Sequence, residues 1–255
     1  MGHSPLRRAP LILVGVLLSL IAGCAHGVSG RHPVTITVFA AASLTGSFTT
    51  LATKFEASQA GVRVGLTFGA SSSLAAQIDN GAPGDVFASA SPALMQKLVA
   101  TRSANAPVSF ASNLMEIAVP PGNPAKIGTL ADLARQGVTV AECESSVPCG
   151  IAASKVFTNA GVSVTPVTRE LDVKAVMAKV VLGEVDAGLV YLTDVLAAGP
   201  RVMGIGIPPA INARSTYPIA VLARSTHTAL AQSFVDFVLS PAGREVLSND
   251  GFGRP

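Results

Sequence analysis

Serine and glycine gather at two places where a strand-like stretch gives way to a helix-like one. In "FAAASL" (residues 39–44) Ser43 stands where an N-cap would, and in "FGASSSLAAQI" (residues 68–78) Gly69 precedes Ser71, Ser72 and Ser73. Hydroxyls and free amides at a helix start are hydrogen-bond donors, and the helix dipole adds partial positive charge. A single serine there is often only a cap, but three serines exceed what one cap uses. The surplus predicts an anionic ligand.

Two further turns offer donors of the same kind. "VPCGIAASKVF" (residues 147–157) begins a helix near Cys149 with free backbone amides, and "LDVKAVMAKVV" (residues 171–181) has Asp172 as a cap with Val173 just inside the helix. Helix N-termini bind anions without a side-chain cation. The four turns therefore predict one anion site built from neutral donors.

No catalytic set accompanies these turns. "GASSS" has Ser73 where the closing glycine of a G-x-S-x-G nucleophile elbow belongs, and no histidine stands in the context of a base. A phosphate-binding G-x-x-x-x-G-K-[ST] loop is absent, and "GIG" at 204–206 lacks the third glycine of a dinucleotide site. The acidic pairs Glu142/Glu144 and Asp186/Asp194 are predicted to be solvated or capping residues. An exported serine hydrolase using Ser71 stays the less favoured alternative.

The first residues predict export. Arg7 and Arg8 precede an apolar run, Leu11–Ile21, that is too short for a comfortable membrane span, and "IAGC" follows. Small residues before a cysteine resemble a bacterial lipobox, so residues 1–23 are predicted to be a lipoprotein signal peptide, with diacylglycerol and palmitate on Cys24. The alternative is an ordinary signal peptide with a chance cysteine. Residues 24–33, small and polar, are predicted to be a tether.

The rest of the chain has the composition of a globular domain. The full sequence is 49% apolar and 13% charged, and loss of the two leader arginines lowers the formal charge from +3 to +1. No basic run predicts nucleic-acid binding. Scattered histidines give no zinc spacing, so no cation site and no cofactor are expected. Cys143 and Cys149 can form a loop-stapling disulfide in an exported protein, or remain two free thiols.

Strand-like and helix-like stretches alternate along the chain, which predicts sheets covered by helices. The expected strands include 34–39, 62–68, 84–90, 113–120, 138–142, a stretch near 162–167, 187–191 and 217–224. The expected helices include 44–55, 72–80, 92–100, 129–137, 151–160, 173–182, 229–239 and 241–247. Two groups of such units predict two α/β lobes with a ligand cleft at the carboxyl ends of strands.

Several stretches, in order, resemble the motifs of the molybdate-binding proteins of bacterial ABC transporters: "VTITVFAAASLTGSFTTLATKF", "FGASSSLAAQIDNGAPGDVFASAS", "VPCGIAASKVF", "LDVKAVMAKVVLGEVDAGLVYLTDV" and "YPIAVL". The resemblance covers the chain from about residue 34 to its end. It implies a two-lobed, type II periplasmic-binding-protein-like α/β fold, each lobe a mixed sheet flanked by helices, with the ligand cleft between lobes. The implied bounds are residues 34–112 with 217–255 for lobe 1 and residues 113–216 for lobe 2.

The resemblance also implies a function and a ligand set. The protein is expected to be a monomeric solute-binding protein, not an enzyme, that is anchored to the outer face of the cell membrane and delivers molybdate or tungstate to an ABC permease. The implied ligands are the hydroxyls of Ser43, Ser71 and Tyr191 and the amides of Cys149 and Val173. The family often has alanine where Cys149 stands, which a backbone donor tolerates.

Other functions stay open. A binding protein for another oxyanion such as sulfate, or for a small organic acid, fits the same donors, and a ligand-sensing module is a third reading. Because no arginine or lysine falls at the assigned positions, an Arg-fork phosphate site is disfavoured. Cavity size is then expected to set selectivity. Bound anion is expected to close the lobes about crossings near residues 111–113 and 215–217.

Overall fold

Strands and helices alternate through the computed structural model, which describes residues 1–3 and 33–255. The strands are β1 Val34–Ala41, β2 Val62–Gly69, β3 Val86–Ala88, β4 Val108–Val119, β5 Val140–Cys143, β6 Thr168–Glu170, β7 Ala187–Tyr191, β8 Met203–Gly206 and β9 Arg214–Val221. The α-helices are α1 Thr45–Ser58, α2 Ser71–Asp79, α3 Pro92–Ala100, α4 Pro148–Ala160, α5 Val173–Val181, α6 Leu192–Ala198, α7 Thr228–Leu239 and α8 Pro241–Asn249. Short 3-10 helices are η1 Ala42–Leu44, η2 Leu130–Ala134 and η3 Gly199–Arg201.

The strands form one mixed sheet in the order β2-β1-β3-β9-β4-β7-β5-β6, and β8 also pairs with β4. Parallel pairs join β1 to β2 and β3, and β5 to β6 and β7. Helices follow the carboxyl ends of β1, β2, β5 and β7, so these ends place helix starts near one another. The sheet class expected from the alternation is observed.

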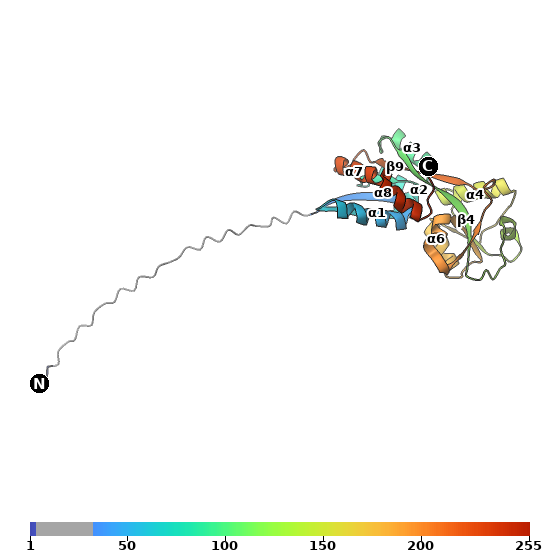
Figure 1. Ribbon diagram of the computed structural model, residues 1–255, viewed down its shortest axis with the longest axis horizontal. Coiled ribbons are helices and arrows are strands. Elements are labelled where there is room, and N and C mark those ends of the chain that lie inside the picture. The colour runs from blue at the N-terminus through green and yellow to red at the C-terminus, as the bar shows by residue number, and fades with distance from the viewer. Residues whose placement is uncertain (4–32) are drawn as a thin grey trace. The chain divides into compact units, whose positions relative to one another are not determined.

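Two long strands connect the two halves of the sheet. Strand β4 pairs with β9 antiparallel over the register that includes Ala111↔Tyr217, Ser112↔Thr216 and Asn113↔Ser215. Figure 1 shows β4 running from the part that carries α1, α7 and α8 to the part that carries α4 and α6. The chain therefore passes between the halves of the sheet on two hydrogen-bonded neighbouring strands.

The buried side chains fall into separate clusters on either side of these crossings. One cluster lies, apart from Ala70, within residues 115–213. The other two are drawn from residues 36–111 and 217–252. Aromatic rings fill the larger of these, with Phe55 packed edge-on against Phe234 at a ring-centroid distance of 5.3 Å. Each half thus has apolar side chains of its own to bury.

Two local expectations were wrong, and the strand β8 was missed. The strand expected near 162–167 lies at Thr168–Glu170, after Pro166, which has no N–H for a sheet ladder. The helix expected over 129–137 is only the 3-10 turn η2, in which Asp132 accepts the Gly128 and Thr129 amides. Strand β8 was not predicted because its sequence, "MGIG", has alternating glycines and a largely exposed edge position.

The predicted leader lies almost wholly outside the described residues. Signal-peptide residues 4–23, Cys24 and all of the tether but Pro33 fall within residues 4–32. Pro33–Pro255 form one compact unit. Of residues 1–3 and 33–255, no helix is both long and apolar enough to cross a bilayer.

Candidate functional site

A small cavity lies where the helix starts of both halves meet. Its volume is about 20 Å³, far below the several hundred Å³ of pockets that hold organic ligands. All the residues nominated from the sequence line it, namely Ser43, Ser71, Cys149, Val173 and Tyr191, together with Ala41, Ala42, Gly69, Ala70, Ala90, Val147 and Pro148. Most of the side chains that line the cavity are small.

Ser71 is the first residue of α2 and is buried. Its Oγ accepts the Ala90 amide at 2.9 Å, which ties the start of α2 to the end of β3. Because an amide N–H can only donate, this contact uses an acceptor position of the hydroxyl and leaves its proton free. Ser71 is therefore a hydrogen-bond donor for the cavity.

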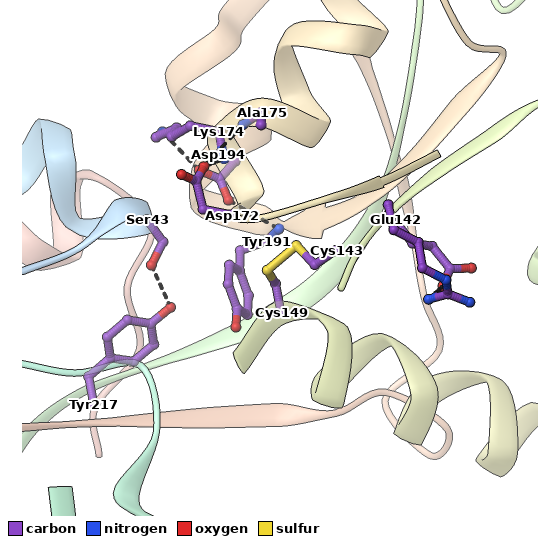
Figure 2. Close-up of a disulfide and its surroundings, with 11 residues drawn as sticks. Ser43, Glu142, Cys143, Cys149, Asp172, Lys174, Ala175, Tyr191, Asp194 and Tyr217 are labelled. Carbon is purple, nitrogen blue, oxygen red and sulfur yellow. Dashed lines mark hydrogen bonds and ion pairs between the residues drawn. A yellow bond between two sulfur atoms is a disulfide. The ribbon is translucent and has the colours of Figure 1, made fainter. Parts of the chain in front are cut away.

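Ser43 does not cap a helix, contrary to expectation. It lies within η1, whose N-cap is Ala41 and has no side-chain cap. The tight 3-10 turn after β1 leaves Ser43 Oγ facing Tyr217, and the two hydroxyl oxygens are 2.9 Å apart, as Figure 2 shows. The serine is thus held by a side chain from β9 rather than by the backbone of its own helix.

Tyr191 ends β7 with its side chain 1% exposed. Its hydroxyl lines the cavity and makes no hydrogen bond of normal geometry to a described residue, although the Ser215 and Tyr217 hydroxyls lie close enough to lower its pKa against the effect of burial. Burial raises the pKa of Tyr191 to about 12, so the hydroxyl keeps its proton at neutral pH. A buried unpaired hydroxyl is costly unless a ligand completes its bonding. The feature points to an acceptor in the cavity.

Two helix starts supply backbone donors. The expected Asp172 cap is confirmed: its carboxylate accepts the amides of Lys174 and Ala175, which leaves the Val173 amide uncapped. Helix α4 has no side-chain cap, and Pro148 at its first turn has no N–H, so the Cys149 amide is the first free donor. Both amides belong to residues that line the cavity.

A disulfide joins Cys143 at the end of β5 to Cys149 at the start of α4 (Figure 2). The intervening loop folds back onto the helix so closely that a Cβ on Gly150 would lie 2.0 Å from the Glu144 carbonyl oxygen. Only glycine fits this contact without moving backbone. The disulfide and Gly150 together hold the loop that carries the Cys149 amide.

No charged side chain lines the small cavity within residues 33–255. One ion pair lies just behind it: Lys174 Nζ is 2.8 Å from Oδ1 of Asp194, whose side chain is fully buried. Asp194 Oδ2 also accepts the Tyr191 amide at 3.3 Å. Burial raises the pKa of Asp194, and the Lys174 ammonium partly offsets that rise. A larger cavity, about 150 Å³, is lined by both Lys174 and Ser43.

Three site residues escaped the sequence-based assignment. Tyr217 contacts Ser43, the Ala90 amide contacts Ser71, and Gly150 admits the disulfide loop. Tyr217 opens "YPIAVL", which was expected as a strand and as a motif of the family, with no role for the tyrosine in the ligand set. The Ser43–Tyr217 pair is 174 positions apart in the chain and therefore leaves no local spacing signal.

The surroundings of Ser71 and of the predicted acidic pairs are as follows within the described residues. Within them no group of three His, Cys, Asp or Glu side chains is arranged to hold a metal ion. No histidine lines the cavity beside Ser71, among the residues that the structure describes. The acidic residue Asp186, expected to cap or be solvated, accepts the backbone and side-chain donors of Thr139. Asp194 is instead buried, contrary to the solvated reading, and serves as a cap for α6.

Comparisons with known proteins agree with this geometry. A family model described as bacterial extracellular solute-binding protein matches residues 36–253. The chain is 44% identical over 221 residues to molybdate-binding protein ModA of Mycobacterium tuberculosis, which covers 86% of this chain and 85% of that protein.

Solved structures share the fold. The periplasmic molybdate-binding protein of Azotobacter vinelandii has a TM-score of 0.77 at 22% identity, covering 86% of this chain and 99% of that one. The sulfate-binding protein SubI of Mycobacterium tuberculosis has a TM-score of 0.76 at 20% identity, covering 87% of each chain. Likeness of fold therefore does not choose between these two anions.

Proposed function

Because this chain belongs to the family of bacterial extracellular solute-binding proteins, we propose that it captures molybdate, and tungstate with it, and delivers the oxyanion to an ABC permease. The observation that carries the proposal is the convergence of three hydroxyls and two helix-start amides on one small uncharged cavity. The 44% identity to a molybdate-binding protein supports molybdate over other anions.

The donors match the chemistry of a tetrahedral dianion. Such an ion has four oxygens that accept hydrogen bonds and has no proton to donate at neutral pH, so its site needs donors only. Ser43, Ser71 and Tyr191 offer hydroxyl protons, and Cys149 and Val173 offer amides. The starts of α4 and α5 add partial positive charge without a cation. The anion is thus stabilised without a buried ion pair.

Selectivity follows from size. Molybdate and tungstate are larger than sulfate, so they reach donors on both walls of the cavity at once. Sulfate in the same site would leave donors unpaired, at a cost of about 1–3 kcal/mol for each stranded group. The 44% identity to a molybdate-binding protein also favours molybdate over a small organic acid.

Closure of two lobes would bring the donors together. Ser43 and Ser71 belong to the proposed lobe 1, residues 34–112 with 217–255, and the other donors belong to the proposed lobe 2, residues 113–216. A bound anion bridges the lobes and favours the closed state, because it gains contacts that the open state lacks. The β4–β9 register at Ser112↔Thr216 is the natural bending point.

Anchoring completes the proposal. Cys24, freed by removal of residues 1–23, carries the lipid, and residues 24–33 tether the binding domain to the outer face of the membrane. The protein works there as a monomeric receptor for the permease, not as a hydrolase. Support comes from the lipobox-like sequence and from the extracellular family.

Ligand-dependent melting tests the function. Titration of the domain from residue 33 onward with molybdate or tungstate is expected to raise its melting temperature, because a ligand bound only by the folded state stabilises it by mass action. Sulfate and phosphate at equal concentration serve as controls and are expected to raise it far less. A rise with sulfate or an organic acid, and none with molybdate, would falsify the assignment.

Tyr191→Phe is expected to separate affinity from stability. Loss of the hydroxyl should weaken molybdate binding by about tenfold, the worth of one hydrogen bond to an anion. The ligand-free melting temperature should stay the same or rise, since the hydroxyl has no partner there within residues 33–255. Isothermal titration and thermal melts measure both quantities. Unchanged affinity would remove Tyr191 from the site.

A further inference from the structure

The two cavity serines differ in what occupies the acceptor side of their hydroxyls. Ser71 Oγ receives the Ala90 N–H at 2.9 Å, and that donor cannot act as an acceptor. The Ser71 proton therefore has its direction set by the fold, away from Ala90. Ser43 Oγ has instead a hydroxyl partner, Tyr217, also at 2.9 Å. The direction of the Ser43 proton depends on which of the two oxygens donates.

A ligand that only accepts hydrogen bonds resolves this choice. Each hydroxyl has one proton, so Ser43 cannot donate to Tyr217 and to an oxyanion at once. If Ser43 serves the cavity, its Oγ must accept the Tyr217 proton. Ser43 and Tyr217 then match Ser71 and Ala90: in each pair the serine oxygen accepts a hydrogen bond from its neighbour, and the serine proton is free to donate to the ligand.

The surroundings of Tyr217 suit a fixed donor. The residue is fully buried on β9, and its ring packs edge-on against Phe252 and Phe110 at centroid distances of 5.5 and 6.3 Å. Burial raises the pKa of Tyr217 well above its ordinary value, so the hydroxyl keeps its proton. The ring is held by packing, which fixes the hydroxyl oxygen beside Ser43.

We infer that Tyr217 is a positioning residue for the oxyanion: its hydroxyl donates to Ser43 Oγ and thereby directs the Ser43 proton into the cavity. This role rests on the proposed function, since it needs an acceptor-only ligand. Tyr217 itself does not line the cavity. It therefore acts through Ser43 and not by contact with the anion.

A double-mutant cycle tests this role. Molybdate dissociation constants are measured by isothermal titration for wild type, Tyr217→Phe, Ser43→Ala and the double variant. Each single change is expected to weaken binding by about tenfold. The double variant is expected to bind no more weakly than Ser43→Ala, because Tyr217 has nothing to direct once the Ser43 hydroxyl is gone.

The matched control pairs Tyr217→Phe with Ser71→Ala. Ser71 has its own donor, so here the two losses are expected to multiply. If Tyr217→Phe causes a general packing defect, it will lower the molybdate affinity by the same factor in the Ser43→Ala and Ser71→Ala backgrounds. That result would overturn the inference. Equal affinity of Tyr217→Phe and wild type would also overturn it, as would a Tyr217→Phe chain that does not fold. If wild type itself fails to bind molybdate, the proposed function fails first.

Discussion

Gly150→Ala is expected to lower both the stability and the molybdate affinity of the protein more than any conservative change elsewhere in the site. The new Cβ would lie 2.0 Å from the Glu144 carbonyl oxygen and 2.9 Å from that of Cys143, and both are backbone atoms. Backbone must move to relieve these contacts, at a cost of about 2–3 kcal/mol in the free energy of unfolding.

The affinity should fall with the stability because the displaced loop carries a donor. Cys143 is bonded to Cys149, so a shift of the loop transmits to the Cys149 amide at the cavity. We expect a loss of about tenfold or more in affinity, as for a hydrogen bond made with poor geometry. Urea unfolding and isothermal titration measure the two effects.

Gly206→Ala is the matched control. A Cβ at Gly206 meets no atom within 4 Å, and the residue lies in the edge strand β8. This variant should unfold and bind as wild type does. Wild-type behaviour of Gly150→Ala as well would show that the loop yields freely, and would contradict the role given to it.

Lys174→Met should destabilise the protein through a carboxylate that the substitution does not touch. The Asp194 side chain is fully buried and has Lys174 Nζ at 2.8 Å as its counter-ion. Loss of one partner leaves a buried charge uncompensated, which typically costs about 3–5 kcal/mol. Because the Lys174 side chain is 37% exposed and solvent screens part of the pair, we expect about 2–3 kcal/mol.

The stability lost in Lys174→Met should become smaller as the pH falls. Burial holds the pKa of Asp194 above its unfolded value, so the folded chain takes up a proton at higher pH than the unfolded chain does. The penalty is therefore full above the folded pKa and declines as the pH falls toward the unfolded value of about 3.9. Urea unfolding of wild type and Lys174→Met over this range should show the gap narrowing on acidification.

Two further variants sharpen the result. Lys174→Met/Asp194→Asn should recover most of the lost stability, since it removes the orphaned charge and keeps an acceptor for the Tyr191 amide. Lys179→Met, on the same helix, breaks a solvent-screened pair with Glu184 and should leave the free energy of unfolding close to that of wild type. Two results would refute the role given to the buried Asp194 charge. One is an equal loss of unfolding free energy in Lys174→Met and Lys179→Met; the other is a difference between wild type and Lys174→Met that stays the same as the pH falls.

The features that depend on neighbouring residues in the sequence were mostly predicted correctly. Alternating strands and helices, the Asp172 cap and the helix starts at Ser71 and Val173 all depend on neighbours within a few residues. Ser43 shows the limit, since the same serine would suit an N-cap, and the turn after β1 decides otherwise. Pro166 shows another, because a β-rich stretch cannot pair where its N–H is missing.

Contacts that depend on tertiary packing could not be predicted from the spacing of residues in the sequence. The contact between Ser43 and Tyr217 joins residues 174 positions apart, and the burial of Asp194 depends on a lysine from the preceding helix. The close approach at Gly150 is set by how the disulfide loop folds back. Each of these is decided by tertiary packing, which composition and period do not encode.

The place of β9 in the sheet also governs when binding becomes possible. β9 lies between β3 and β4 although it is the last strand of the chain, whereas β5, β6 and β7 lie together and are complete sooner. As a nascent chain lengthens, the half that supplies the Cys149 and Val173 amides can assemble first. The half with Ser43 waits for Tyr217 and for the helices α7 and α8 that cover it. We therefore expect a chain that ends before β9 to lack the Ser43–Tyr217 contact and to bind molybdate more weakly than the full chain, which titration of a truncated protein would measure.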